Sequence, residues 1–220
     1  LAHAMGAAGY WPVLIGRMHA IGPDQLHGYA ERLVGDHSAN YVGGTPGVDH
    51  GALTGTQGPA RISLIKSGPG QNAYEVHDEY VTAATVARLN ELGIRRRSGV
   101  AWEPFSLSVG FMLPHQPFVA HRRDYDKYAG HVPPPKHAEP YGDHLHPYFR
   151  WWRERCGITD VTDEEVMRAR TAYWALVGRV DEMVGDILEA LQRNGLADNT
   201  LIVYSSDHGE QLGEHGLWWK

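Results

Sequence analysis

Residues 200–210 read TLIVYSSDHGE, and this stretch decides the fold that we predict for the chain. Its apolar first half, 200–204, has the composition of a buried strand. Asp207 and His208 follow side by side, with Gly209 directly after them. Carboxylate and imidazole groups are common ligands of divalent metals, and a glycine lets the backbone approach an ion closely. We therefore predict a strand that ends in a metal-binding pair; the alternative is a turn with a solvated histidine.

The segment before this strand has the pattern of a long helix. Thr162 and Glu165 form the signature of a capping box, and apolar residues follow at helical spacing up to the C-cap signal Asn194-Gly195. A helix, a short turn and a strand that ends in polar residues is the layout of an open α/β sheet with a site at its edge. The predicted fold class is therefore α/β with a mostly parallel central sheet.

Weaker patterns predict the remaining elements. We expect strands at 11–16, 60–66 and 104–112, a helix at 75–97, and irregular chain at 17–59 and 114–147. The strand at 104–112 is apolar on both faces, which is typical of the centre of a parallel sheet.

Length and composition narrow the function classes. The 220 residues carry a net charge of −6, which argues against a nucleic-acid partner. No apolar run approaches the ~18 residues of a membrane span. The single cysteine, Cys156, cannot form a disulfide within the chain. The sequence begins at Leu1 and ends at Lys220 without a turn signal, so we expect residues 1–220 to be part of one catalytic domain, truncated at both ends.

Two further groups of residues follow predicted strands. His115 comes after the strand at 104–112, between two prolines that restrict its loop, and the alternative is a histidine packed at a strand end. Arg17 and His19 follow the strand at 11–16; two apart on an extended chain, they would face the same side and could bind one anion.

The last residues of the chain complete the set. Lys220 follows two tryptophans, and a partly desolvated lysine is a good anion clamp, whereas a surface lysine is the default. Glu210, Glu214 and His215 could orient metal ligands or form an ordinary polar loop. Three strand ends thus supply a metal pair and several cationic groups. This combination indicates hydrolysis of a phosphate or sulfate ester, with the metal polarising the ester and the cations neutralising its oxygens.

These residues resemble the sulfatase family of the alkaline-phosphatase superfamily. The resemblance rests on NTLIVYSSDHGE at 199–210, LGEHG at 212–216 and PHQPF at 114–118, while GPDQLHG at 22–28 is most similar to the choline-sulfatase branch. It implies an alkaline-phosphatase-like α/β/α sandwich, of which this chain is a part. The implied activity is metal-dependent hydrolysis of sulfuric esters, which releases inorganic sulfate and an alcohol.

The resemblance also implies roles for single residues. His115 and Lys220 would contact the sulfate as catalytic and substrate-binding residues, and His115 could assist the leaving group. His19 matches a catalytic histidine in the family's Gly-Lys-x-His motif. This chain has Arg17 where the motif has lysine; the positive charge is the same, but the geometry of the hydrogen-bond donors differs. Arg17 is accordingly expected to bind substrate.

The cofactors are implied in the same way. Asp207 and His208 would bind a divalent metal ion, calcium in most sulfatases, with manganese as the alternative. The paired aspartates that complete the metal site, and the Cys/Ser-x-Pro-x-Arg motif whose first residue becomes the formylglycine nucleophile, would lie upstream of Leu1. Gly157-Ile158-Thr159 follows Cys156, so this thiol does not match that motif. We therefore expect the chain alone to be inactive.

Alternatives stay open at this point. A phosphonate monoester or phosphodiester hydrolase of the same superfamily would share the Asp-His-Gly block, and a non-catalytic, degenerate binding domain could keep the fold. The expected partner is a small-molecule sulfate ester, with no nucleic acid and no membrane; a homo-oligomer of the full-length protein is left open.

Overall fold

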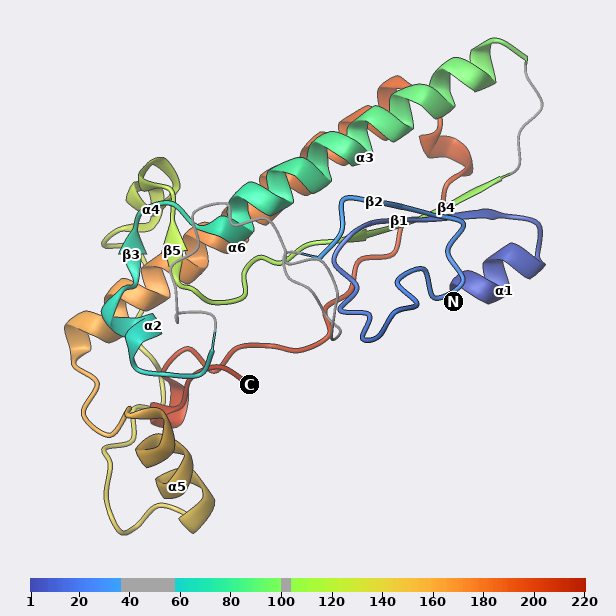
Figure 1. Cartoon of the computed structure of the whole chain (residues 1–220). Coiled ribbons are helices and arrows are strands. Elements are labelled where there is room, and N and C mark those ends of the chain that lie inside the picture. The colour runs from blue at the N-terminus through green and yellow to red at the C-terminus, as the bar shows by residue number, and fades with distance from the viewer. Residues whose placement is uncertain (37–57, 100–103) are drawn as a thin grey trace. The chain divides into compact units, whose positions relative to one another are not determined.

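The structure is a computed structural model of the chain, and it describes residues 1–36, 58–99 and 104–220 (Figure 1). The helices are α1 (Ala2–Ala7), α2 (Ile62–Ile65), α3 (Ala73–Arg97), α4 (Arg122–Tyr128), α5 (Pro147–Cys156) and α6 (Asp163–Arg193), with short 3-10 helices η1 (Ala197–Asn199) and η2 (Glu214–Gly216). The strands are β1 (Trp11–Gly16), β2 (Glu31–Leu33), β3 (Gly68–Pro69), β4 (Phe105–Gly110) and β5 (Val119–Ala120). All pairs among these strands are parallel, which confirms the predicted α/β class.

The chain forms two compact units. Unit 1 comprises Leu1–His50, Ala73–Met112 and Val180–Ile202, and unit 2 comprises Gly51–Asn72, Leu113–Arg179 and Val203–Lys220. The long helix α6 begins in unit 2 and ends in unit 1.

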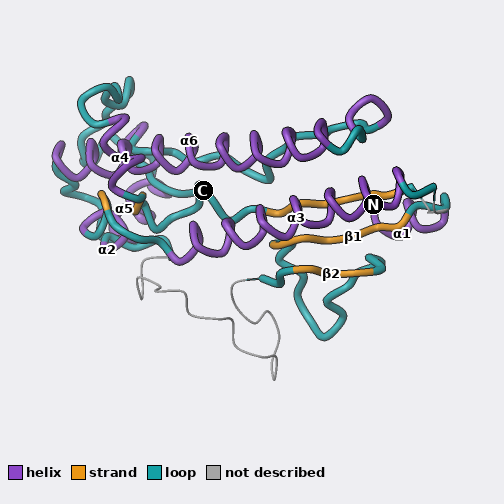
Figure 2. Tube along the Cα trace, turned by 90° about the horizontal axis from the view of Figure 1, so that it is seen from above, coloured by secondary structure: helices purple, strands orange, loops and turns teal. Residues whose placement is uncertain are grey.

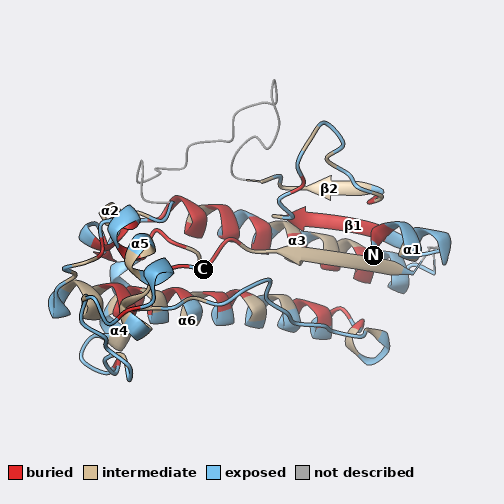
Figure 3. Ribbon diagram, turned by 90° about the horizontal axis from the view of Figure 1, so that it is seen from below, coloured by how far each residue is buried: buried red, intermediate tan, exposed pale blue. Residues whose placement is uncertain are grey.

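Unit 1 contains a parallel sheet in the order β2-β1-β4. Val13 of β1 pairs with Glu31 on one side and with Leu107 on the other. Five of the six residues of β1 are buried, whereas every residue of β4 is half-buried (Figure 3). Among the described strands β1, and not the predicted strand near 104–112, lies at the centre of the sheet, because β1 has a hydrogen-bonded neighbour on each side.

Both faces of β1 are covered by apolar side chains, as its uninterrupted apolar sequence requires. Val13 and Ile15 pack against Val81 of α3, which runs alongside the strands in Figure 2. Leu14 points to the opposite face and packs with Ala2 of α1. This double coverage fixes the carboxyl end of β1, which leads into Arg17 and His19.

The two long helices confirm the clearest sequence patterns. At the start of α6 the amide nitrogen of Glu165 lies 3.2 Å from Oγ1 of Thr162, and the amide of Thr162 lies 2.9 Å from Oε2 of Glu165. This is the predicted capping box. Beyond the other end, Gly195 has a φ of 67° that suits a residue without a side chain. None of the described helices is both long and apolar enough to cross a bilayer.

Unit 2 packs around its own apolar core, in which β3 and β5 form a small parallel sheet. The buried members of this core come from α2, α5, α6, the β5 region and the end of the chain: Leu64, Phe118, Cys156, Ile158, Ala169, Ala172, Trp218 and Trp219. The last two residues before Lys220 are thus core residues rather than part of a mobile end.

Three local predictions are corrected. Residues 60–66 contain the helical turn α2 instead of a strand. The segments expected to be irregular contain β2, β5 and α4, although 37–57 lies outside the described residues. Residues 200–204 form no strand: no described strand pairs with them, and Leu201 and Val203 are 89% and 79% exposed. An apolar run becomes a strand only when a neighbour supplies the ladder of hydrogen bonds.

Candidate functional site

A cluster of polar side chains in unit 2 brings together four of the predicted site residues. Nζ of Lys220 lies 2.9 Å from Nε2 of His208. The rings of His115 and His208 lie 6.3 Å apart between centroids, edge to face at 72°. Oδ2 of Asp207 lies 3.6 Å from Nε2 of His208. Residues from distant parts of the sequence therefore meet at one place, while their chemical roles stay predictions.

Hydrogen bonds to carbonyl groups set the tautomers of both histidines. Nδ1 of His208 lies 2.8 Å from the carbonyl oxygen of Gly209, and Nδ1 of His115 lies 2.7 Å from that of Gln116. Because a carbonyl oxygen only accepts, each Nδ1 must carry the hydrogen. The lone pair of neutral His208 is then on Nε2, where it accepts a hydrogen bond from the Lys220 ammonium. A metal ion bound at Nε2 would stand where that ammonium now lies.

The donor set at this place suits a divalent cation but is incomplete. A carboxylate oxygen of Asp207 and the imidazole nitrogen of His208 are both common metal ligands. Within the described part of the chain, no group of three or more His, Cys, Asp or Glu residues could hold a metal ion. Asp207 and His208 are thus two potential ligands, fewer than a metal centre needs.

Lys220 is held beside His208 by the turn between them. Oε1 of Glu210 accepts hydrogen bonds from the amides of Leu212 and Trp219, at 3.2 and 2.6 Å. Burial raises the pKa of Glu210, and the three backbone amides that donate to it offset only part of that effect. Trp219 is 2% exposed and anchors the end of the chain in the core of unit 2. The hydrogen bonds of Glu210 thus order the turn that leads to Lys220, and its role in orienting metal ligands stays a prediction.

Glu214 and His215 have a different place. Glu214 accepts hydrogen bonds from the amides of Lys136 and His137, at 3.2 and 2.9 Å. The imidazole of His215 stacks on that of His137, 5.2 Å between centroids and 2° from parallel. Glu214 and His215 thus connect the turn at 212–216 with the segment at 136–137, as expected for residues of an ordinary polar loop.

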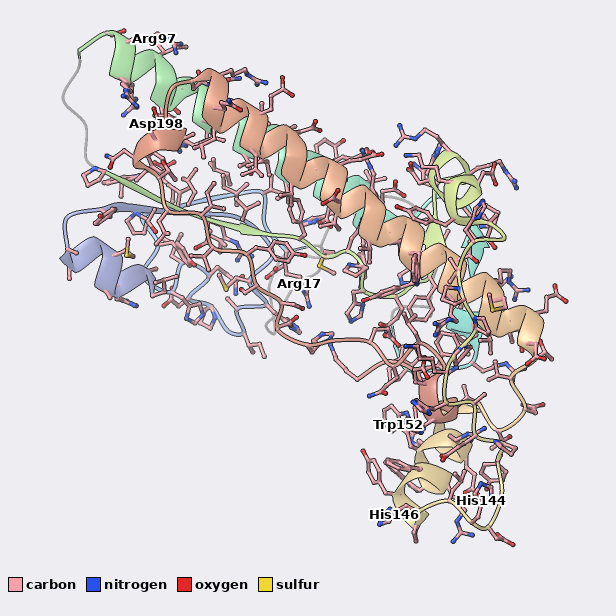
Figure 4. All side chains as sticks on the ribbon, turned by 180° about the vertical axis from the view of Figure 1, so that it is seen from behind. Arg17, Arg97, His144, His146, Trp152 and Asp198 are labelled. Carbon is pink, nitrogen blue, oxygen red and sulfur yellow. The ribbon has the colours of Figure 1, made fainter. Side chains whose placement is uncertain are left out.

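Arg17 and His19 follow β1 in unit 1, where Arg17 is labelled in Figure 4. The amide of Arg17 donates to the carbonyl oxygen of Gly110 at 2.8 Å. His19 has a φ of 53°, so the segment is not extended, and the expected alternation that would turn both side chains to one side does not apply. Because these residues belong to unit 1, their convergence with the cluster in unit 2 stays a prediction.

The two amides that follow Arg17 already have a carboxylate as their partner. Among the described acidic side chains, none forms an ion pair with the Arg17 guanidinium. Burial raises the pKa of the Tyr74 hydroxyl, and the positive charge of Arg17 offsets part of that rise. The amides of Met18 and His19 donate to Oδ1 of Asp36, at 3.1 and 3.4 Å.

Two features bear on residues outside the predicted set. Cys156 is a buried free thiol whose pKa is raised by burial, the opposite of what a nucleophilic cysteine needs. His77 and Asp78 form a buried pair in the first turns of α3, which the sequence analysis missed. Only their adjacency near a helix start could have pointed to them, and that pattern is common on solvated helix faces.

Comparison with known proteins places the chain among relatives. A family model described as Sulfatase matches residues 1–219. The chain is 37% identical to a choline-sulfatase of Rhizobium meliloti (strain 1021), over the whole of this chain and 44% of that protein. It is 33% identical to an iduronate 2-sulfatase of Mus musculus, over 53% of this chain and 24% of that protein.

The fold has a counterpart among solved structures. A phosphonate monoester hydrolase, SpPMH from Silicibacter pomeroyi, aligns with a TM-score of 0.61 and 22% identity, over 99% of this chain and 48% of that one. The chain thus spans about half the length of the relatives that it matches throughout.

Proposed function

The chain belongs to the sulfatase family, and from this premise we propose that the full-length protein hydrolyses sulfuric esters to inorganic sulfate and an alcohol. One observation carries the proposal most directly: Lys220, His208 and His115 meet in unit 2 beside Asp207, within a sequence that matches the family throughout. A cation, two imidazoles and a carboxylate are the groups that a metal-assisted attack on an anionic ester requires.

In this proposal Asp207 and His208 contribute ligands to one divalent cation, for which we propose calcium, with manganese as the alternative. The Nδ1 hydrogen bond to Gly209 supports the assignment of His208, because it leaves Nε2 as the donor atom. A bound divalent cation would polarise the ester and stabilise negative charge on its oxygens. Lys220 would then leave Nε2 and turn to an anion.

The remaining side chains would handle the sulfate and the proton. Lys220 binds a sulfate oxygen, and His115, with its Nδ1 hydrogen committed to Gln116, gives a proton from Nε2 to the departing alcohol. His19 and Arg17 add positive charge around the ester, with Arg17 offering a planar fork of donors. For the nucleophile we propose a formylglycine; no Cys or Ser of residues 1–220 is followed by Pro two positions on and Arg four positions on, so none of them matches its precursor motif.

A second candidate is hydrolysis of phosphonate monoesters. It is favoured by the likeness in fold to SpPMH, which is a phosphonate monoester hydrolase. Sulfate and phosphonate monoesters share tetrahedral oxyanion chemistry, so the same cationic groups could bind both.

The test compares an aryl sulfate, choline sulfate and an aryl phosphonate monoester as substrates of the full-length protein. We expect the full-length protein to hydrolyse a sulfate ester. A chelator should abolish this turnover and added calcium should restore it, and Asp207→Asn should lower kcat/KM by at least about 100-fold. Faster turnover of the phosphonate would favour the second candidate. Absence of turnover on all three substrates, with equal calcium binding by wild type and Asp207→Asn, would refute both and favour a binding domain.

A further inference from the structure

A buried pair of charged residues lies in the first turns of α3, within unit 1. Nδ1 of His77 lies 2.9 Å from Oδ1 of Asp78, and Nε2 of His77 lies 2.8 Å from the carbonyl oxygen of Gly35. Both partners of the ring are acceptors, so both ring nitrogens must carry hydrogens, and His77 is an imidazolium. Its exposure is 3% and that of Asp78 is 0%. A buried ion pair is costly to build, and a well-packed apolar pair could replace it where only stability is needed.

Asp78 also holds the end of β4. The amide nitrogen of Met112 lies 2.9 Å from both carboxylate oxygens of Asp78. Met112 stands two residues after the last residue of β4, and along the chain it leads to Pro114 and His115. The carboxylate of Asp78 thus fixes the backbone where the chain leaves the sheet towards His115.

His77 reaches the ends of the other two strands through Gly35. Its hydrogen bond to the Gly35 carbonyl holds the chain directly before Asp36, two residues beyond the end of β2. Oδ1 of Asp36 accepts from the amides of Met18 and His19, which follow β1. Oδ2 of Asp36 is paired with Arg32 at 2.9 Å, which fixes the orientation of the carboxylate.

We propose that His77 and Asp78 are positioning residues, which tie the chain segments after β1, β2 and β4 to one helix and so hold the backbone that carries Arg17 and His19. This proposal rests on the proposed function, since those two residues are the unit 1 part of the proposed sulfate ester site. His77 and Asp78 are buried, so the role that we propose for them is positioning and not contact with substrate. Positioning of this kind matters for rate, because a displacement of about 1 Å in a catalytic group can cost roughly 100-fold.

The test uses the full-length protein with His77→Gln and Asp36→Asn, two changes that keep size and polarity. Asp78→Asn is the direct variant, but it leaves a buried imidazolium without its counter-ion and could prevent folding. Thr85→Val is the control, because Thr85 is buried on the same helix and its hydroxyl donates to the Val81 carbonyl, 2.7 Å away on its own helix.

Hydrogen exchange followed by mass spectrometry measures how firmly the backbone of these segments is held, and it does not depend on enzyme activity. We expect exchange at least about tenfold faster in peptides covering 17–20 for both variants, and in peptides covering 111–113 for His77→Gln, with 12–15 of β1 unchanged. We also expect kcat/KM for a sulfate ester to fall by about 10- to 100-fold, and Asp36→Glu to recover part of the loss.

The outcomes separate the two proposals. Exchange in these peptides no faster than in Thr85→Val would overturn the positioning role, whatever the activity. An unchanged kcat/KM in His77→Gln and Asp36→Asn would overturn it as well. A wild type without sulfate ester turnover would instead refute the proposed function.

Discussion

Nζ of Lys220 lies 2.9 Å from Nε2 of His208, the atom that we propose as a metal ligand. Both residues are exposed. In the proposed site the Lys220 ammonium and a metal ion would compete for Nε2 of His208, and Lys220 would bind the ester once the metal is bound. Removal of the ammonium should therefore not weaken metal binding.

Lys220→Met in the full-length protein should lower kcat for a sulfate ester by about 10²- to 10³-fold, because one positive charge at the reacting group is lost. Calcium affinity should stay equal or rise, since the competing ammonium is removed. Steady-state kinetics and calcium titration measure the two effects. Lys66→Met, which changes an exposed lysine of unit 2, is the matched control. A fall in calcium affinity with Lys220→Met would contradict this account.

Glu210 should matter as a hydrogen-bond acceptor and not as a charge. Its carboxylate accepts from Trp219 and Leu212, and burial raises its pKa, so ionisation in the folded state is disfavoured. Folding therefore loses stability as pH rises from the ordinary pKa, about 4.3, towards the higher folded value. Glu210→Gln keeps an acceptor oxygen without the charge.

We expect Glu210→Gln to match or exceed the wild-type melting temperature at pH 7.5. Glu210→Ala removes the acceptor of the Leu212 and Trp219 amides and should cost about 1–3 kcal/mol, which lowers the melting temperature by several degrees. Calorimetry of both variants gives the comparison. Equal losses in the two variants would show that the charge itself is needed.

The His77–Asp78 pair predicts a pH dependence of stability on the alkaline side. Burial lowers the pKa of His77, but its bonds to Asp78 and to the Gly35 carbonyl, with the charges of Asp78 and Asp36, outweigh burial and raise it. A raised histidine pKa contributes stability that is complete below about pH 6.5, the ordinary value, and is lost as pH rises through the folded value.

The melting temperature of the wild type should accordingly fall more between pH 6 and pH 9 than that of His77→Gln, which should start lower and change less. His144→Gln, at an exposed histidine of unit 2, should follow the wild-type curve. Parallel curves for the wild type and His77→Gln would mean that this imidazole does not titrate in that range.

The sequence predicted elements whose signals are local, and it missed those that depend on partners. The capping box at Thr162 and the spacing after it define α6 without reference to any other segment. Residues 200–204 have the composition of a strand, but strand formation depends on a neighbour's amides and carbonyls, which no composition reports. The segment at 60–66 was mistaken because a short apolar run suits a helical turn as well as a strand.

The same distinction applies to the candidate site. His115, Asp207, His208 and Lys220 could be chosen from residue type and motif, and unit 2 brings them together. His77 and Asp78 could not be chosen in this way, because their partners are the carbonyl of Gly35 and the amide of Met112. Nearly every residue has these backbone groups, so the sequence does not show which of them a side chain contacts.

The close approach of β1 and β4 at their carboxyl ends gives the last prediction. Gly16 pairs with Gly110, and a Cβ placed on Gly110 would lie 1.7 Å from the carbonyl oxygen of Arg17. The obstacle is backbone, which cannot move aside as a side chain could, so the segment that carries Arg17 would have to shift. Gly110→Ala should lower the melting temperature by several degrees, as overpacking costs about 1–3 kcal/mol, and should raise KM for the sulfate ester.

Gly185→Ala is the control, because a Cβ there meets nothing within 4 Å on the exposed face of α6, and alanine should stabilise that helix by about 1 kcal/mol. A Gly110→Ala protein as stable and as active as Gly185→Ala would show that the backbone near Arg17 is less constrained than the 2.8 Å bond between the Arg17 amide and the Gly110 carbonyl indicates.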